Sequence, residues 1–327
     1  MRKPAARLFS ITALAVCCAA SAQAPAPLSA ADIDTMFNEL SNWGRWGADD
    51  QRGTLNLITP EKRRQAAALV KEGISVSLSQ DLPNTHEATS LNGQVQQMQK
   101  IMTAAPGTPV AMDEWRIFYH GLLYAHMDAL CHARYKDKAY NGFAASEASE
   151  SGCASSGIEH LKDGMLSRGI LIDVPRLKGV PYLEPGTPVL ASDIEAWEKQ
   201  TGLTIEPGDV VLVRTGRWAP RDAAPTNLQG GSPGVHVTAL PLLRARDVAV
   251  LGTDVGLDVI PTGVDGVVIP THTVAIASIG LIIIDNADLE ELAATAARLN
   301  RWEFMFSAAP IPVKGGTGSV LNAVATF

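Results

Sequence analysis

Short continuous runs of apolar residues alternate with polar, helix-like segments along most of the chain. Four of these runs are typical of strands whose two faces are both buried. They cover residues 169–174, 208–214, 248–252 and 279–284. Because buried strands that alternate with helices favour a sheet covered on both faces, we predict a mixed α/β fold in a single domain.

Capping residues mark where the helices between these strands begin and end. Thr59 with Pro60, Ser192 and Asp288 predict helix starts, and a glutamate three residues after the last two would complete a capping box. The corresponding ends are Gly73, Gly202 and Leu299. Two shorter elements are also expected, a helix over residues 32–40 and an alternating strand over residues 74–78.

Two polar regions interrupt this alternation. Residues 80–113 have no regular pattern and are expected to form a flap near a functional site. Residues 141–164 are small and polar, and are expected to form a loop over a pocket. The glycine-rich residues 315–319 lack the lysine and the following helix of a phosphate-binding loop, so we interpret them as a turn.

The first 24 residues predict a secretory signal peptide. Arg2, Lys3 and Arg7 precede a short apolar run, which ends before the small residues Ala22-Gln23-Ala24. The predicted location is therefore periplasmic or secreted, and residues 25–327 would form the mature domain. An uncleaved anchor, or a lipoprotein modified at Cys17 or Cys18, is the alternative.

Charge and cysteine content narrow the class of protein further. The 327-residue chain carries a formal net charge of −7. Loss of residues 1–24 removes three positive charges and no negative ones, which leaves −10 and argues against nucleic acid as a partner. Cys131 and Cys153 would remain; they either pair in an oxidising compartment or stay as buried thiols, and we favour the thiols.

The densest cluster of ionisable residues lies in residues 118–143, FYHGLLYAHMDALCHARYKDKAYNGF. It places His120, His126, Asp128 and His132 within thirteen positions. A helix would scatter this spacing around its axis, whereas on an extended segment all even positions point to one face. Since imidazole nitrogens and carboxylate oxygens bind divalent metals such as zinc, we predict a metal site on that face.

These residues resemble the signature of the cyclase-like metal-dependent hydrolases, which include bacterial kynurenine formamidase and isatin hydrolase. The family motif is H-x-G-T-H-x-D-x-P-x-H, and LLYAHMDALCH matches its second His, its Asp and its last His. Leu122 stands where the first His is expected. Five further segments extend the resemblance over nearly all of the mature chain and indicate a longer-chain branch: GRWGADDQRGTLNLITPE, GDVVLVRTG, LGTDVGLDVIP, THTVAIASIGLIIIDNADLEELA and PIPVKGGTGSVLN.

The resemblance implies a swivelling β/β/α-type fold and a set of site residues. His126 and Asp128 fall on metal ligands, and His132 falls on a residue that takes up a proton or binds a second ion. His272 and Asp285 look like the family's downstream His and acid. A water, a group from elsewhere or His120 would replace the missing first His, and we favour His120.

The implied activity is hydrolysis of an amide, lactone or cyclic amide bond in a small-molecule substrate. A divalent ion, with zinc or manganese expected, would lower the pKa of its water from about 15.7 toward about 7. His132 and His272 are the expected catalytic residues, and the resemblance implies a homo-oligomer, either a dimer or a tetramer. No membrane span is expected.

Two other classes of function remain open. A periplasmic small-molecule binding protein on the same fold, with a degenerate metal site, would explain the missing first His. A thiol enzyme using Cys131 is the weaker rival, because odd parity places Cys131 on the face opposite the histidines. Asp254 is interpreted as a strand-end hydrogen-bonding residue, and His86, His160 and His236 as surface or loop residues.

Overall fold

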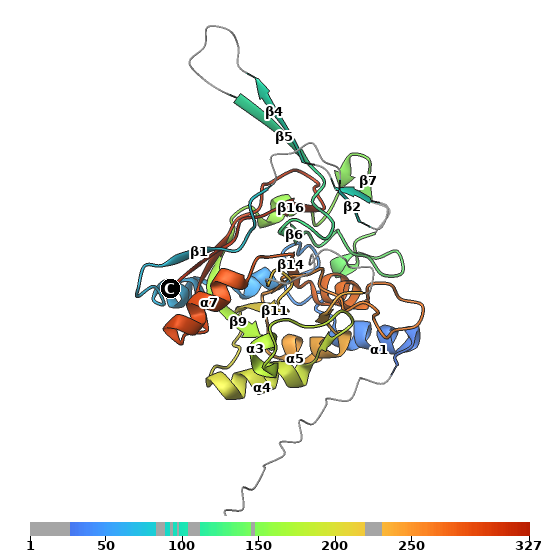
Figure 1. The fold of residues 1–327 in the computed structure, drawn as a ribbon. Helices are drawn as coiled ribbons and strands as arrows, with labels where there is room; N and C mark the ends of the chain where they lie inside the picture. The colour runs from blue at the N-terminus through green and yellow to red at the C-terminus, as the bar shows by residue number, and fades with distance from the viewer. Residues whose placement is uncertain are drawn as a thin grey trace, which may run out of the picture.

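One large mixed sheet organises the chain in the computed structural model (Figure 1), which describes residues 27–82, 89–91, 94–96, 98–103, 112–144, 148–219 and 231–327. Nine strands of this part form the sheet, in the order β1-β17-β15-β9-β11-β13-β14-β6-β16. The strands are β1 (Ser75–Ser77), β17 (Val324–Thr326), β15 (Glu303–Ala308), β9 (Met165–Asp173), β11 (Val210–Arg214), β13 (Val250–Thr253), β14 (Ile282–Asp285), β6 (His126–Asp128) and β16 (Gly318–Val320).

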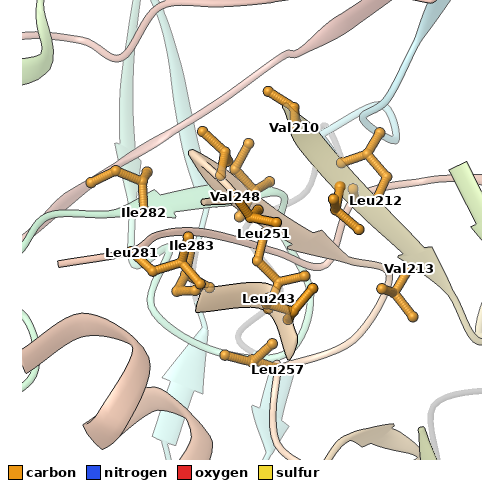
Figure 2. Packing of buried hydrophobic residues seen from close by; sticks show 14 of the residues in the cluster. Val210, Leu212, Val213, Leu243, Val248, Leu251, Leu257, Leu281, Ile282 and Ile283 are labelled. Atoms are coloured by element: carbon orange, nitrogen blue, oxygen red, sulfur yellow. The ribbon is translucent and has the colours of Figure 1, made fainter. Parts of the chain in front are cut away.

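The four apolar runs form the parallel centre of the sheet, β9, β11, β13 and β14. Every residue of β11, β13 and β14 is buried. Figure 2 shows Leu212, Leu251 and Ile283 from these strands among other packed aliphatic side chains. Burial of each such side chain contributes about 1.5–3 kcal/mol. The remaining strands pair antiparallel on either side, so the mixed α/β fold expected from the sequence is confirmed.

Helices and short helical turns cover the sheet, and α3, α4 and α5 gather on one side of its central strands (Figure 1). The α-helices are α1 (Ala30–Leu40), α2 (Pro60–Ala67), α3 (Val174–Lys178), α4 (Ala191–Thr201), α5 (Leu240–Ala245), α6 (Pro270–His272) and α7 (Glu290–Leu299). The turns are the 3-10 segments η1 (Gly53–Leu57), η2 (Tyr140–Gly142), η4 (Ile158–Leu161) and η6 (Val237–Ala239), and the π-helical segment η7 (Thr273–Ile279).

Several predicted boundaries shift. Thr59 caps α2 by accepting a hydrogen bond from the Lys62 amide at 3.2 Å, but the helix ends at Ala67, before Gly73. At α4 the capping box predicted from Ser192 is wrong, because Asp193 accepts the bond from the Leu190 amide at 2.9 Å. The strand expected over 279–284 starts later, since the residues up to Ile279 form η7.

The two polar regions contain more strand than their sequence indicates. Residues 80–113 were expected to be irregular, yet β2 (Thr89–Leu91) pairs with β3 (Gln94–Gln96), and β4 (Met98–Thr103) pairs with β5 (Met112–Ile117). The β4–β5 pair projects away from the sheet (Figure 1). Four other short strands complete the described set: β7 (Ala148–Ser149) pairs with β8 (Gly152–Cys153), and β10 (Pro188–Val189) pairs with β12 (Gly234–Val235).

Some predictions concern residues that the structure does not describe. The proposed signal peptide, His86 and much of the proposed flap lie outside the described residues. Among the helices that are described, none is both long and apolar enough to cross a membrane.

The preference for two free cysteines is wrong, because Cys131 and Cys153 form a disulfide. The prediction assumed that Cys131 lies on an extended strand, where its odd position would direct it into the core. The strand β6 ends at Asp128, and the turn that follows directs Cys131 toward β8. The thiol-enzyme hypothesis loses its nucleophile with this bond.

Candidate metal centre

Asp128, the last residue of β6, lies at the centre of a group of four histidines. Its side chain is 1% exposed, and neither carboxylate oxygen has a hydrogen-bond partner among the described residues. Its oxygens lie 3.3 Å from His120 Nδ1, 3.7 Å from His126 Nε2, 4.0 Å from His132 Nε2 and 3.7 Å from His272 Nε2. A buried carboxylate without hydrogen bonds is costly, so this arrangement calls for a cation between the carboxylate and the imidazoles.

His126 is fixed in the tautomer that a metal ligand requires. Its Nδ1 lies 2.8 Å from the carbonyl oxygen of Tyr124, and because a carbonyl only accepts, Nδ1 must carry the proton. Nε2 is then left with its lone pair directed toward Asp128. A second hydrogen bond that orients an imidazole in this way is typical of metal-binding histidines.

His120 reaches Asp128 from the segment in which Leu122 stands at the motif's first His position, and its Nδ1 lies 3.3 Å from Asp128 Oδ1. Its Nε2 is hydrogen-bonded to Thr317 Oγ1 at 2.8 Å, and its buried Nδ1 has no hydrogen-bond partner in the described part of the chain. The segment is held there from two sides: Asn286 donates to the Gly121 carbonyl at 2.7 Å, and the Arg217 guanidinium donates to the Leu122 carbonyl. Residues 120–124 form bends and are not an extended strand. His120 therefore reaches the site because the chain bends there, and not because even positions of a strand share one face.

The strand β16 also shapes the position of His120. Gly318 faces Asp128 across the β6–β16 pair. A Cβ at this position would lie 2.5 Å from the Met127 carbonyl oxygen and 3.0 Å from His120 Cε1. Only glycine therefore lets β16 approach β6 while Thr317, its neighbour, reaches the His120 ring.

His132 follows the turn after β6, where its amide donates to the Ala129 carbonyl at 2.9 Å. Its ring stacks on that of His120, with 4.1 Å between centroids and 8° between planes. Its side chain is 28% exposed, whereas those of His126 and His272 are 3% and 10% exposed. His132 is therefore the most solvent-accessible of these three imidazoles.

His272 lies between two carboxylates at the end of α6. Its Nδ1 is 2.5 Å from Asp258 Oδ2, and its Nε2 is 3.2 Å from Asp285 Oδ2. Asp258 also accepts hydrogen bonds from the backbone amides of Thr271 and His272. Asp258 thus fixes both the main chain and the ring of His272.

The electrostatic environment gives His132 and His272 opposite pKa shifts. Burial raises the pKa of Asp128, but the four imidazoles, led by His132, outweigh it and lower that pKa overall. Burial lowers the pKa of His132 and exceeds the opposing attraction of Asp128. Burial also lowers the pKa of His272, yet Asp285 and Asp258 together hold it well above its ordinary value. Without a metal ion, these shifts favour the protonated form of His272 and the neutral form of His132.

Two sets of side chains place ligand atoms close enough to hold an ion: His120, Asp128 and His132, and His126, Asp128 and Asp285. Within each set the ligand atoms lie within 4.8 Å of one another. Nitrogen and carboxylate oxygen donors suit zinc, manganese and iron. All six predicted site residues, His120, His126, Asp128, His132, His272 and Asp285, therefore come together in space.

Other predicted residues lie elsewhere or have structural roles. Asp254 is fully buried and accepts hydrogen bonds from the Thr215 hydroxyl and from three consecutive backbone amides, as expected of a structural residue. His160 lies in η4, 4.0 Å from Glu159. His236 lies in the loop between β12 and η6, one of its two expected places, but it is not on the surface: it is 3% exposed and its Nδ1 lies 2.8 Å from Thr238 Oγ1.

Sequence reasoning did not single out Asp258 or Thr317. Asp258 belongs to the segment LGTDVGLDVIP, and its position shortly before His272 gave no pattern that distinguishes it from Asp254. Thr317 belongs to the glycine-rich turn, where only the absence of a phosphate loop was noted. Contacts with residues of other segments, His272 for Asp258 and His120 for Thr317, place both residues, and sequence spacing does not encode such contacts.

A pocket of about 100 Å³ opens beside this cluster. His132 and Thr317 belong both to its wall and to the cluster of imidazoles and their partners. The rest of the wall comes from two loops joined by the disulfide, with the residues Cys131, Arg134, Ala139, Phe143, Ala144, Cys153, Ala154 and Ser155. A small ligand can thus approach the site from the side of His132.

The sequence profile of the putative cyclase family matches residues 73–259. A solved structure described as a novel cyclase is 29% identical over 89% of this chain and 99% of its own, with a TM-score of 0.78. Isatin hydrolase A from Labrenzia aggregata, bound to benzyl benzoate, is 19% identical, with 80% and 94% of the two chains covered and a TM-score of 0.56. The corresponding enzyme from Ralstonia solanacearum is 18% identical, with 80% and 93% covered and a TM-score of 0.55. These two show that the fold is shared. No functionally characterised protein in a curated collection matches the sequence.

Proposed function

Because the chain belongs to the putative cyclase family, we propose that it is a metal-dependent hydrolase that cleaves an amide, lactone or cyclic amide bond of a small molecule. One observation carries the proposal. Both oxygens of the buried Asp128 lack hydrogen-bond partners among the described residues, and four imidazoles surround them. The isatin hydrolases that share the fold support hydrolysis as the class of reaction.

Asp128 would hold the ion together with either His126 and Asp285 or His120 and His132. A divalent ion bound there would supply an activated water and polarise the scissile carbonyl. Zinc or manganese is proposed, since both accept mixed nitrogen and oxygen ligands. The tautomer of His126 is fixed in advance by the Tyr124 carbonyl, which lowers the cost of assembling the site.

His132 has the properties required of the group that moves a proton. It faces the pocket, and its lowered pKa leaves it neutral and able to accept a proton near neutral pH. It would return that proton to the leaving amine or alkoxide. His272, buried between Asp258 and Asp285, would hold a second positive charge or ion against the site.

The test begins with protein purified without chelator. We expect bound zinc or manganese in stoichiometric amount, and hydrolysis of at least one member of a panel of aryl formamides, lactones and cyclic amides. His126→Ala and Asp128→Asn should lose both metal and activity, whereas Leu122→Ala should keep both. Absence of stoichiometric metal, together with unchanged activity in both variants, would overturn the proposal.

The same experiment separates this proposal from a non-catalytic binding protein. That alternative rested on the missing first His, and His120 Nδ1, 3.3 Å from Asp128, would supply the nitrogen that the motif lacks. A binding protein would bind members of the panel without turnover at any metal content. Turnover that is lost with the metal excludes it.

We further propose that the chain is exported and that it assembles as a dimer or tetramer. The Cys131–Cys153 disulfide supports an oxidising compartment, because such bonds rarely persist in the cytosol. Exposed apolar side chains in the segment before α6, with Val268 81% exposed, support a contact between copies. Export is tested by mass spectrometry of protein recovered from the periplasm, in which cleavage should leave Pro25 as the first residue. Assembly is tested by light scattering of the same protein.

A further inference from the structure

We infer that Arg134 selects substrates that carry an anionic group, and that this group binds in the pocket beside His132. The inference rests on the proposed function and specifies the class of substrate. Arg134 lines the pocket of about 100 Å³ together with His132, and the two residues are separated by one position in the chain. A ligand that places its scissile bond near His132 therefore presents its other end to the guanidinium.

The wall of this pocket carries a positive charge at Arg134. Among the described residues of its wall none carries a carboxylate, and Arg134 is the one permanent cation. Most of the remaining wall is apolar or small, with Phe143, three alanines and the disulfide sulfurs. In such surroundings a guanidinium binds a carboxylate through paired, charge-assisted hydrogen bonds more strongly than it would in open water.

Arg134 is also available for a ligand. It makes no ion pair or side-chain hydrogen bond with another residue in the part of the chain that the structure describes, and it is exposed. The neighbouring cation Lys136 differs, because it lies 2.6 Å from Asp34. Since Asp34 is already engaged by Lys136 and by the Tyr135 hydroxyl, it is not a competing partner for Arg134.

The pocket is fixed before a ligand arrives. The disulfide joins the loop that carries Arg134 to the loop that carries Ser155, so the two walls cannot separate. A preformed site loses less conformational entropy on binding. A fixed cation on the approach also attracts an anionic substrate toward the site by long-range electrostatics.

A matched pair of ligands tests the inference without requiring turnover. Calorimetry of the metal-loaded protein should show 3-hydroxybenzoate binding about tenfold more tightly than its neutral methyl ester. Arg134→Gln should abolish this difference and Arg134→Lys should retain part of it. Lys138→Gln removes an exposed cation from the same loop outside the pocket, and should leave the preference unchanged.

Equal or undetectable binding of the two ligands by the wild type would overturn the inference, and so would a preference that persists in Arg134→Gln, because the metal would then be the carboxylate's partner. Kinetics separate this failure from failure of the proposed function. Water cleaves 3-acetoxybenzoate to acetate and 3-hydroxybenzoate, and it cleaves the methyl ester of that substrate in the same way at the acetyl group. If Asp128→Asn abolishes hydrolysis of both esters while the wild type shows no preference between them, the hydrolase proposal stands and the role of Arg134 does not.

Discussion

His126 and Asp285 are paired directly across the antiparallel strands β6 and β14. The first belongs to the histidine-rich segment in the first half of the chain and the second to the end of a buried strand near its C-terminus. The register of one strand pair therefore joins the two halves of the site. A shift of β6 by one residue in this register would turn His126 to the opposite face of the sheet, so pairing with the fully buried β14 keeps the two side chains together.

Asp128→Asn should remove the metal while it preserves the shape of the side chain. The amide carries no charge, and its nitrogen would point toward imidazole nitrogens that are expected to act as ligands. We expect activity to fall by at least about 100-fold. Elemental analysis of the purified variant should show less than stoichiometric metal, and unchanged circular dichroism would confirm that the fold is retained. Full metal content in this variant would contradict the central place of Asp128.

His120→Ala and Leu122→Ala form a pair that tests which residue fills the first ligand position. His120 Nδ1 approaches Asp128, whereas Leu122 is held by its main-chain carbonyl. We expect His120→Ala to weaken metal binding by about 10- to 100-fold and Leu122→Ala to leave it nearly unchanged. Competition with a chelator of known affinity measures both values. The reverse order would place the ligand elsewhere.

Much of the fold was readable from sequence, because apolar runs report directly on strands buried on both faces. The centre of the sheet at β11 and β13 follows this pattern to within two residues. The π-helical segment η7 was missed, since a continuous apolar run fits a buried helix as well as a buried strand. The Ser192 capping box failed because Asp193, one position later, competes for the same role.

The site was predicted in its members but not in its geometry. The spacing of His126, Asp128 and His132 matched a known motif, whereas the expected extended segment covers only β6, and bends and a turn carry His120 and His132 to Asp128. Residues that orient the site, such as Asp258 beside His272, are placed by contacts between segments that are far apart in the chain or that carry no recognisable motif. No pattern in a single sequence encodes such contacts.

Asp258→Asn should impair His272 without removing any expected metal ligand. The carboxylate accepts a hydrogen bond from His272 Nδ1 and fixes the ring, and an asparagine could instead direct its amide nitrogen at that atom. We expect kcat to fall by about 10- to 100-fold with little change in KM, as is typical when a residue that orients an imidazole is lost. Asp258→Glu should restore part of the activity. An unchanged kcat in the asparagine variant would show that orientation by Asp258 is unimportant.

Loss of the disulfide should destabilise the protein and loosen the pocket. A cross-link between positions 22 residues apart stabilises by about 3 kcal/mol through the unfolded chain. We expect Cys131→Ser combined with Cys153→Ser to lower the melting temperature measured by differential scanning calorimetry. A reducing agent should lower that of the wild type to the same value and leave that of the variant unchanged. A reductant effect in the variant would point to a cause other than this bond.

Metal binding should release a proton from His272 and none from His132. Asp285 and Asp258 raise the pKa of His272 well above its ordinary value, which favours the protonated ring in the metal-free protein. Burial lowers the pKa of His132, so that ring is already deprotonated and able to bind. Proton release on metal binding should therefore decline as the pH rises through the raised pKa of His272.

Titration of the apo-protein with zinc in two buffers of different ionisation enthalpy measures the number of protons released. We expect about one in the wild type and in His132→Gln, and none in His272→Gln. Equal release in wild type and His272→Gln would assign the proton to another group.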